Sequence, residues 1–449
     1  MKLRRGGGKE TLVQRSKMTI ERRMDIKEAS RILVLDPIHG ADVIADELKE
    51  LGKDVAVSNP YREQSSFNRL DYDLVIAPVH LSPKFEIVKQ ALEKNIPFMS
   101  HQEAVKEIAV SNGLFADINV IEVTGTVGKT SVCELICQLL KGKKVLSHTS
   151  SSTRFNSTDG VIRFPRHSST PASVLNVMRI VAEKNLEPDI AVFEISLGLT
   201  GIGDVGVITS LEGDYRIAGG TENASAVKLA SINNFDAKSI IVHPLDVNVG
   251  GNTYGDEDAN LWLAGNKVLF NRLKTLNGDY IDGKLAFRAF DSFIETEHYR
   301  NCLGAAFCAV LSLGVPPDEL NTNISTVEGR MQLGSLKGRF LIDNSNSGTK
   351  LKFLDVITEL ARQLSGKMIL ILGEESQYVC EGVDVEELKE VVDNNASEFV
   401  EVIIVGDEFK GKIGGKNVFF SDGLDAALEK AINDSKEGFV IISNVKTWR

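Results

Sequence analysis

The stretch that decides the fold is residues 123–131, which read Val-Thr-Gly-Thr-Val-Gly-Lys-Thr-Ser. An apolar run typical of a buried strand precedes it at 118–123, and a run typical of a helix follows it at 132–140. A glycine-containing loop between strand and helix, closed by a lysine and a hydroxyl residue, is the pattern of a phosphate-binding loop. Glycines let backbone N–H groups turn toward phosphate oxygens, and the helix N-terminus adds partial positive charge. The stretch therefore predicts a nucleotide-binding site.

Each residue of this loop has an expected role. Lys129 can reach the β- and γ-phosphates, and the Thr130 hydroxyl can bind Mg²⁺. The usual spacing G-x-x-x-x-G-K-[ST] is broken, because Val123 stands where the first glycine belongs. A glycine turn formed by chance is the alternative, and the lysine, the hydroxyl and the strand–helix context argue against it. The predicted nucleotide-binding residues are Thr124, Gly125, Thr126, Val127, Gly128, Lys129, Thr130 and Ser131.

The composition limits the class of protein. The chain has 449 residues, enough for about three domains of ordinary size. Hydrophobic residues make up 43% and charged residues 25%, as in soluble globular proteins. The net charge of −11 argues against a nucleic-acid partner, since phosphate contacts need clustered basic residues. No apolar run is long enough to span a membrane, and five cysteines make no disulfide framework, so we expect a cytoplasmic protein.

Strand and helix patterns alternate along most of the chain, which indicates an α/β fold. Residues 1–29 include a basic, glycine-rich segment without an apolar core, and we expect a disordered tail there. We predict a Rossmann-like substrate domain at 30–113, a central P-loop ATPase domain at 114–328 and a second Rossmann-like domain at 329–449. His39 and His80 both follow strands of the first domain, where open α/β sheets bind ligands, although turn residues without function are equally consistent with this placement.

Two further residues are candidates for chemistry. Glu194 ends an apolar strand, 189–196, and can bind a second Mg²⁺ or position its water. A solvated residue at the rim of the sheet is the alternative interpretation. Lys228 lies in a helix of small residues, where spacing alone indicates only a surface lysine.

These motifs, in this order, resemble the Mur ligases and folylpolyglutamate synthetase. The family's phosphate loop reads T-G-T-x-G-K-[ST], as residues 124–130 do. The glutamate-serine strand end at 194–196 and the lysine-bearing helix at 226–229 also match. Further matches to the family are the helix at 298–306, the Gly329-Arg330 pair and the strand end Ile342-Asp343. The resemblance covers roughly residues 30–449 and implies a three-domain Mur ligase architecture.

The resemblance also implies an activity, cofactors and roles. Mur ligases use ATP and Mg²⁺ to convert a carboxylate into an acyl phosphate, from which a nucleophile displaces phosphate. The implied catalytic residues are Lys129, Glu194 and Lys228, and the implied metal ligands are Thr130, Glu194 and Lys228, whose side chain is often carbamylated in the family. Asn301, Arg330 and Asp343 would join the nucleotide-binding set, with Arg330 reaching ATP across the gap between domains.

The chain departs from the family where amino acids are bound. Tyr215 stands in place of a metal-binding histidine, and residues 343–349 have lost a histidine and a proline. These departures, with the His39-Gly40 turn, resemble a divergent methanogen branch that closes a carbocyclic ring on a nickel seco-tetrapyrrole propionate. Such a reaction needs no amino-acid pocket. A basic loop could pair with the carboxylates of that substrate, or be a solvated loop; its residues are Arg154, Arg163, Arg166 and His167.

Two alternatives stay open at this point. An amide ligase of the pseudomurein peptide type would add an amino acid to a peptide precursor. A non-catalytic ATP-binding module would bind nucleotide without turnover, and the loss of two family histidines supports it. For each function we expect a monomer with a small-molecule carboxylate partner and with no nucleic-acid or membrane partner.

Overall fold

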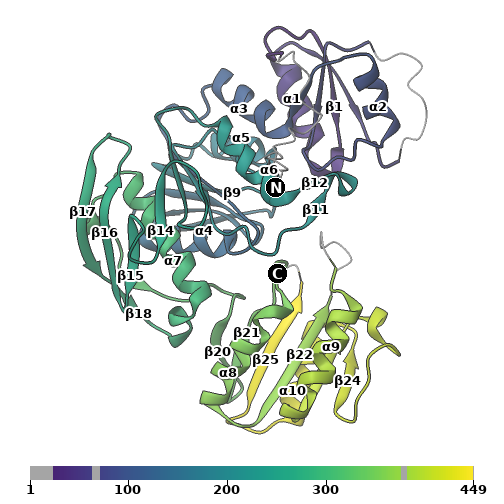
Figure 1. Ribbon diagram of the computed structural model, residues 1–449, viewed down its shortest axis with the longest axis vertical. Helices are drawn as coiled ribbons and strands as arrows, with labels where there is room; N and C mark the ends of the chain where they lie inside the picture. The colour runs from purple at the N-terminus through teal and green to yellow at the C-terminus, as the bar shows by residue number, and fades with distance from the viewer. Residues whose placement is uncertain (1–23, 63–70, 376–381, 448–449) are drawn as a thin grey trace, which may run out of the picture.

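The computed structural model describes residues 24–62, 71–375 and 382–447, which form three α/β units in chain order (Figure 1). The first unit holds a parallel four-stranded sheet of order β2-β1-β3-β4. Its strands are β1 (Arg31–Leu35), β2 (Asp54–Ser58), β3 (Leu74–Ala77) and β4 (Phe98–Ser100), and its helices are α1 (Ala41–Glu50), α2 (Glu86–Glu93) and α3 (His101–Ser111).

The folded part of this unit begins before residue 30. Ile26 and Ala29, which we placed in the disordered tail, are buried in one core cluster with Ile32 of β1 and Ile44 of α1. An apolar side chain buried there stabilises an ordered segment, so the tail prediction does not hold for residues 24–29. Residues 1–23 lie outside the described residues.

The central unit is built on an eleven-stranded sheet of order β17-β16-β15-β14-β13-β10-β5-β9-β6-β7-β8. Its middle strands β10, β5, β9 and β6 run parallel, so their carboxyl ends share one edge. The strands of this unit are β5 (Asn119–Thr124), β6 (Val145–His148), β7 (Thr153–Ser157), β8 (Gly160–Phe164), β9 (Ile190–Glu194), β10 (Val205–Ile208), β11 (Arg216–Ile217), β12 (Glu222–Asn223), β13 (Ile240–Pro244), β14 (Asn252–Gly255), β15 (Leu261–Ala264), β16 (Lys267–Lys274), β17 (Tyr280–Ala286), β18 (Arg288–Ala289) and β19 (Asn323–Ile324).

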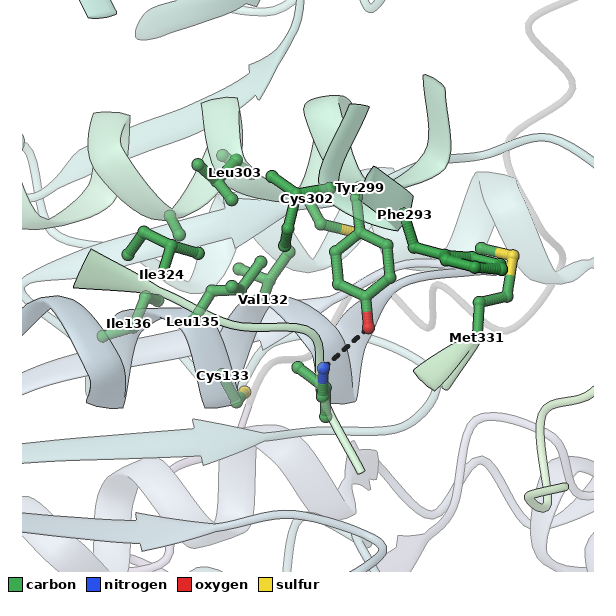
Figure 2. Close-up of a cluster of buried hydrophobic side chains, with 14 of the residues drawn as sticks. Val132, Cys133, Leu135, Ile136, Phe293, Tyr299, Cys302, Leu303, Ile324 and Met331 are labelled. Atoms are coloured by element: carbon green, nitrogen blue, oxygen red, sulfur yellow. Dashed lines mark hydrogen bonds between the residues drawn. The ribbon is translucent and has the colours of Figure 1, made fainter. Parts of the chain in front are cut away.

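Helices α4 (Lys129–Leu139) and α7 (Glu297–Ser312) pack against each other in this unit, and α5 (Ser173–Glu183) and α6 (Ala224–Ala230) complete its helices. Figure 2 shows the apolar residues Val132, Leu135 and Ile136 of α4 facing Leu303 of α7. The phenol of Tyr299 is fully buried beside them and accepts a hydrogen bond from the Val327 N–H at 2.7 Å (Figure 2). A buried, hydrogen-bonded tyrosine keeps the segment after α7 in register with the core.

The third unit has a six-stranded sheet of order β20-β21-β25-β22-β23-β24, in which only β20 pairs antiparallel among the described residues. Its elements are β20 (Gln332–Leu336), β21 (Arg339–Asp343), α8 (Leu354–Leu364), β22 (Met368–Glu374), α9 (Val385–Asn395), β23 (Glu401–Val405), β24 (Val418–Ser421), α10 (Leu424–Asp434) and β25 (Val440–Lys446). Across the described ranges, no helix combines the length and apolar character that a bilayer crossing needs.

Candidate active site

The predicted phosphate loop lies between β5 and α4, at the carboxyl edge of the central sheet. Gly125 has φ of 152°, and a Cβ atom there would lie 2.1 Å from the Thr209 hydroxyl oxygen, so only glycine fits. The residues that follow β10 hold the loop in position, because the Thr126 N–H donates to the Ser210 carbonyl at 2.7 Å. Likewise, the Thr209 hydroxyl donates to the Val127 carbonyl at 2.6 Å. The loop is therefore held in place by the neighbouring strand.

Lys129 begins helix α4 directly after Gly128, whose φ is 87°. Its ammonium donates to the Gly125 carbonyl at 3.2 Å, so the side chain folds back over the loop. Burial lowers the pKa of Lys129, and the nearby Glu194 carboxylate opposes that shift. Ser131 is buried in the first turn of α4, under the loop.

Glu194 lies at the end of β9 and is buried, with 3% of its surface exposed. One of its carboxylate oxygens, Oε2, accepts hydrogen bonds from the Thr130 hydroxyl at 2.6 Å and from the Ser150 N–H at 3.0 Å. The Ser150 hydroxyl lies 3.3 Å from the same oxygen and 3.3 Å from the Thr130 hydroxyl. Glu194 is therefore no solvated rim residue, and three oxygen-bearing groups converge beside Lys129.

Ser150, which follows β6, was not predicted from the sequence. Its place beside Glu194 follows from the sheet, because β6 pairs with β9 and both strands end at the same edge. Adjacent parallel strands bring the residues that follow them together. That pairing, however, is not visible in the sequence of either strand.

Glu122 of β5 is a second buried acid that the sequence did not single out. Its carboxylate accepts hydrogen bonds from the N–H groups of Thr200 at 2.6 Å and of Gly203 at 2.7 Å. Burial raises the pKa of Glu122, and these hydrogen bonds oppose the shift. Glu122 thus orders the glycine-rich segment that follows Glu194, and this segment is tied back to β5 where Gly198 N–H donates to the Thr124 hydroxyl at 3.2 Å.

Arg330 connects the central and C-terminal units. Its guanidinium donates to the Asn346 side-chain oxygen at 3.0 Å and to the Ser151 hydroxyl at 3.4 Å. Its carbonyl accepts a hydrogen bond from the buried Tyr299 phenol. Burial lowers the pKa of Arg330 and Glu194 opposes the shift, so the guanidinium lies within electrostatic reach of the Glu194 site.

Asp343 ends β21, as predicted, and accepts a hydrogen bond from the Ser345 N–H at 2.9 Å. The segment that follows is mostly buried and forms hydrogen bonds within itself and to Gly329. For example, the Asn346 amide donates to the Gly329 carbonyl at 2.9 Å, and Asn346 accepts from the Gly348 N–H at 2.9 Å. The polar residues that replace the family's histidine segment thus build the support for Arg330.

Lys228 is buried on α6, with 1% of its surface exposed, which rules out the plain surface lysine that its spacing indicated. Its ammonium lies 5.0 Å from the ring centroid of Tyr215, the residue that stands where the family has a metal-binding histidine. A cation over an aromatic face is stabilised by the ring quadrupole. The structure therefore places Lys228, an implied metal ligand, against Tyr215, which replaces a metal-binding histidine of the family.

Asn301, predicted to bind nucleotide, lies away from the phosphate loop. Its side chain is exposed and lines a cavity with Tyr254, Gly255 and Glu295. The α7 residue next to the loop is Cys302, whose Sγ lies 3.9 Å from the Gly128 carbonyl. Asn301 is rotated about 100° around the helix from Cys302, so it cannot share that face.

His298 shares the face of α7 that carries Cys302. Its imidazole lies close to Gly128 on one side and 5.4 Å from the Phe353 ring on the other. Burial lowers the pKa of His298 to about 4, so the ring is neutral near pH 7. This histidine lies beside the phosphate loop, although the sequence indicated it only as part of the helix at 298–306.

The residues of the predicted basic loop have different surroundings, and two of them, Arg154 and Arg163, lie in strands β7 and β8. The guanidinium of Arg154 forms an ion pair with the carboxylate of Glu134 on α4, within the central unit. Arg163 is exposed on β8, and His167 is half-buried. Arg166 is exposed but donates from Nε to the Ser150 carbonyl at 2.8 Å, which places it beside the Glu194 site. Of the loop residues, Arg166 is thus the one that the structure brings to the site.

Known proteins resemble the chain in sequence. A family model described as "Coenzyme F430 synthetase CfbE, C-terminal domain" matches residues 333–447. The coenzyme F(430) synthetase of Methanosarcina acetivorans is 31% identical, in an alignment that covers 93% of this chain and 99% of that protein.

Solved structures resemble the chain in fold. MurF from Acinetobacter baumannii has a TM-score of 0.56 at 14% identity, and the match covers 83% of this chain and 88% of MurF. A bifunctional folylpolyglutamate synthase/dihydrofolate synthase, solved with Mn, AMPPNP and L-glutamate, has a TM-score of 0.54 at 15% identity, over 77% of this chain and 90% of that one. The predicted three-domain Mur ligase fold is confirmed. Because the sequence match extends over nearly the full length of both chains, this protein belongs to the coenzyme F430 synthetase family of Mur-type ligases.

Proposed function

We propose that this chain catalyses the coenzyme F430 synthetase reaction, in which ATP activates a propionate of a nickel seco-tetrapyrrole and a ring carbon closes the carbocycle. The observation that supports carboxylate activation is the convergence of Lys129, Thr130, Glu194 and Arg330 at one edge of the central sheet. The name of the Methanosarcina acetivorans relative supports the product.

The donor set fits a hard divalent cation. Thr130, Glu194 and Ser150 offer oxygen atoms only, and Mg²⁺ prefers oxygen ligands in such sites. We therefore assign Thr130 and Glu194 to Mg²⁺ and the loop N–H groups to the phosphates of ATP. The folylpolyglutamate synthase that shares this fold was solved with Mn and AMPPNP, which is consistent with that assignment. The ion, when bound, neutralises charge on the transferring phosphoryl group.

The chain's own residues supply the rest of the proposed chemistry. Lys129 and Arg330 place two positive charges where negative charge builds during phosphoryl transfer. Arg330 contacts both the central unit and Asn346 of the C-terminal unit, so closure of the units would exclude water from the acyl phosphate. A substrate carboxylate near Ser150 would lie beside the Arg166 guanidinium.

The nucleophile is the point that separates the cyclase from a peptide ligase. An intramolecular cyclase releases ADP and phosphate with the tetrapyrrole acid alone, whereas an amide ligase also needs an added amino acid. We expect phosphate release with the nickel seco-tetrapyrrole acid and ATP, unchanged by any amino acid. Phosphate release measured on a panel of carboxylates, each with and without amino acids, tests this. Release that requires an amino acid and ignores the tetrapyrrole would exclude the cyclase, and nucleotide binding without any release would support a non-catalytic module.

We propose that Lys228 is carbamylated and that the oxygen atoms of its carbamate would bind Mg²⁺. Lys228→Ala is then expected to lower turnover about 10²-fold or more, because a charged group that orients the metal is lost. A short carboxylate such as acetate should restore part of the activity, since it supplies the missing anionic oxygens.

Lys238→Ala, at an exposed lysine of the same unit, is the matched control and should keep full activity. Turnover is measured across a range of acetate concentrations for both variants. Full activity of Lys228→Ala without acetate would remove the residue from the mechanism.

A further inference from the structure

A second group of chemistry-bearing side chains lies in the N-terminal unit, outside the phosphate site. Asp36 follows β1, His39 lies three residues later, and His80 follows β3. One carboxylate oxygen of Asp36 lies 2.6 Å from His39 Nδ1 and 3.4 Å from His80 Nε2. One potential ligand atom from each residue falls within 4.8 Å of the others. The three side chains therefore converge on one point.

The local backbone is shaped to make this convergence. Asp36 has φ of 78°, in the left-handed region that residues other than glycine rarely adopt. Its carboxylate accepts a hydrogen bond from the His39 N–H at 3.3 Å, which closes a tight turn over residues 37–39. Because β1 and β3 are parallel neighbours, His80 emerges beside this turn. Residues from two separate segments are thus held in one cluster by the sheet.

The donor types identify the class of ligand. Two imidazole nitrogens and one carboxylate oxygen suit zinc, nickel and cobalt, whereas Mg²⁺ and Ca²⁺ prefer oxygen alone. His80 Nε2 is buried and makes no hydrogen bond to any described residue, although it points at the Asp36 carboxylate. Asp36 is fully buried, and the Tyr61 phenol lies 3.2 Å from the same carboxylate oxygen. We propose that Asp36, His39 and His80 bind a divalent transition-metal ion.

A free ion fits this cluster better than a metal already held in a macrocycle. A metal in a planar tetrapyrrole accepts at most one protein ligand on each face, whereas this cluster offers three donor atoms within 4.8 Å of one another. The site is thus distinct from the nickel of the proposed substrate and does not depend on that assignment.

The position of the cluster indicates what the ion would do. The turn after His39 packs against the central unit, since a Cβ on Gly40 would lie 2.5 Å from Ala172 Cβ at the start of α5. Nearby, Gln102 of α3 donates to the Leu197 carbonyl at 3.0 Å, three residues after Glu194. Figure 1 shows this junction between the N-terminal and central units. An ion bound by this cluster would hold the ends of β1 and β3 together at the junction.

Metal binding to the full-length protein tests the proposal. Protein stripped with a chelator is dialysed, without nucleotide or carboxylate substrate, against Zn²⁺, Ni²⁺ or Co²⁺, and bound metal is quantified by elemental analysis. We expect one ion per chain, and Co²⁺ should give a visible absorption spectrum of nitrogen and oxygen ligation. His39→Ala and His80→Ala should each weaken binding at least about tenfold and abolish that spectrum.

Two controls keep the test decisive. His243→Gln changes a histidine of β13, far along the chain from the cluster, and should bind metal as the unaltered protein does. Asp36→Asn keeps a residue type that tolerates the left-handed backbone, so loss of metal in that variant reports on the carboxylate. Failure of the unaltered protein to bind any of the three ions, or equal affinity in the double variant His39→Ala/His80→Ala, would overturn the proposal. Because the assay contains no ATP, neither result bears on the proposed synthetase activity.

Discussion

Lys129→Ala is expected to abolish measurable turnover, with a loss of at least about 10³-fold in kcat. The ammonium of Lys129 lies over the loop, 3.2 Å from the Gly125 carbonyl, and we expect it to exchange this contact for phosphate oxygens when ATP binds. The interaction becomes stronger as charge moves onto the transferring phosphoryl group, so its loss should reduce kcat more than it weakens ATP binding. Steady-state phosphate release and ATP affinity, measured side by side, separate the two effects.

The matched control for this variant is Lys141→Ala, an exposed lysine just after the end of α4. It removes the same charge from the opposite end of the same helix, away from the loop, and should leave kcat unchanged. Thermal unfolding of both variants shows whether the fold is intact. A fall in kcat of less than about tenfold in Lys129→Ala would show that the loop lysine does not stabilise the transition state.

Glu194→Gln is expected to lower kcat by about 10²-fold or more and to raise the Mg²⁺ concentration needed for half-maximal activity. The glutamine amide oxygen can still accept from the Thr130 hydroxyl and the Ser150 N–H, so the variant should fold. It lacks the negative charge that we propose to bind the cation and that opposes the shift in the pKa of Lys129. Activity titrated with Mg²⁺ at saturating ATP measures both changes.

Glu187→Gln provides the comparison, because Glu187 precedes the same strand and is exposed. That variant should match the unaltered protein in kcat and in Mg²⁺ requirement. If Glu194→Gln kept both values, Glu194 would be a structural acid that orders Thr130 and Ser150, and the metal assignment would be wrong.

The phosphate loop was predictable because its determinants are local. A strand, two glycines, a lysine and a hydroxyl residue stand within about ten residues, and each acts through the backbone geometry of its immediate neighbours. The structure accordingly places residues 124–131 where the sequence indicated, from the last residue of β5 to the first turn of α4. Glu194 was singled out for a similar reason, because it ends an apolar strand, whereas Asp343 was named only from the resemblance to the Mur ligases.

Helix faces were less predictable. Asn301 and Cys302 are adjacent in sequence, and only the packing of α7 against α4 determines which of them meets the loop. The same holds for Lys228, whose surroundings of small residues look exposed in sequence, while α6 buries it against Tyr215. A motif matched letter by letter does not specify the rotation of a helix.

The sequence by itself therefore determined the order of the α/β units, the phosphate loop and the strand-end acids, because periodicity and turn chemistry act over a few residues. Only the tertiary structure decided which distant residues share a site. Ser150 reaches Glu194 and His80 reaches Asp36 because the residues that follow parallel strands lie together, and Arg330 reaches Ser151 because the units pack together. Those contacts depend on strand order and unit packing, which arise from burial of the whole core and not from any single stretch of chain.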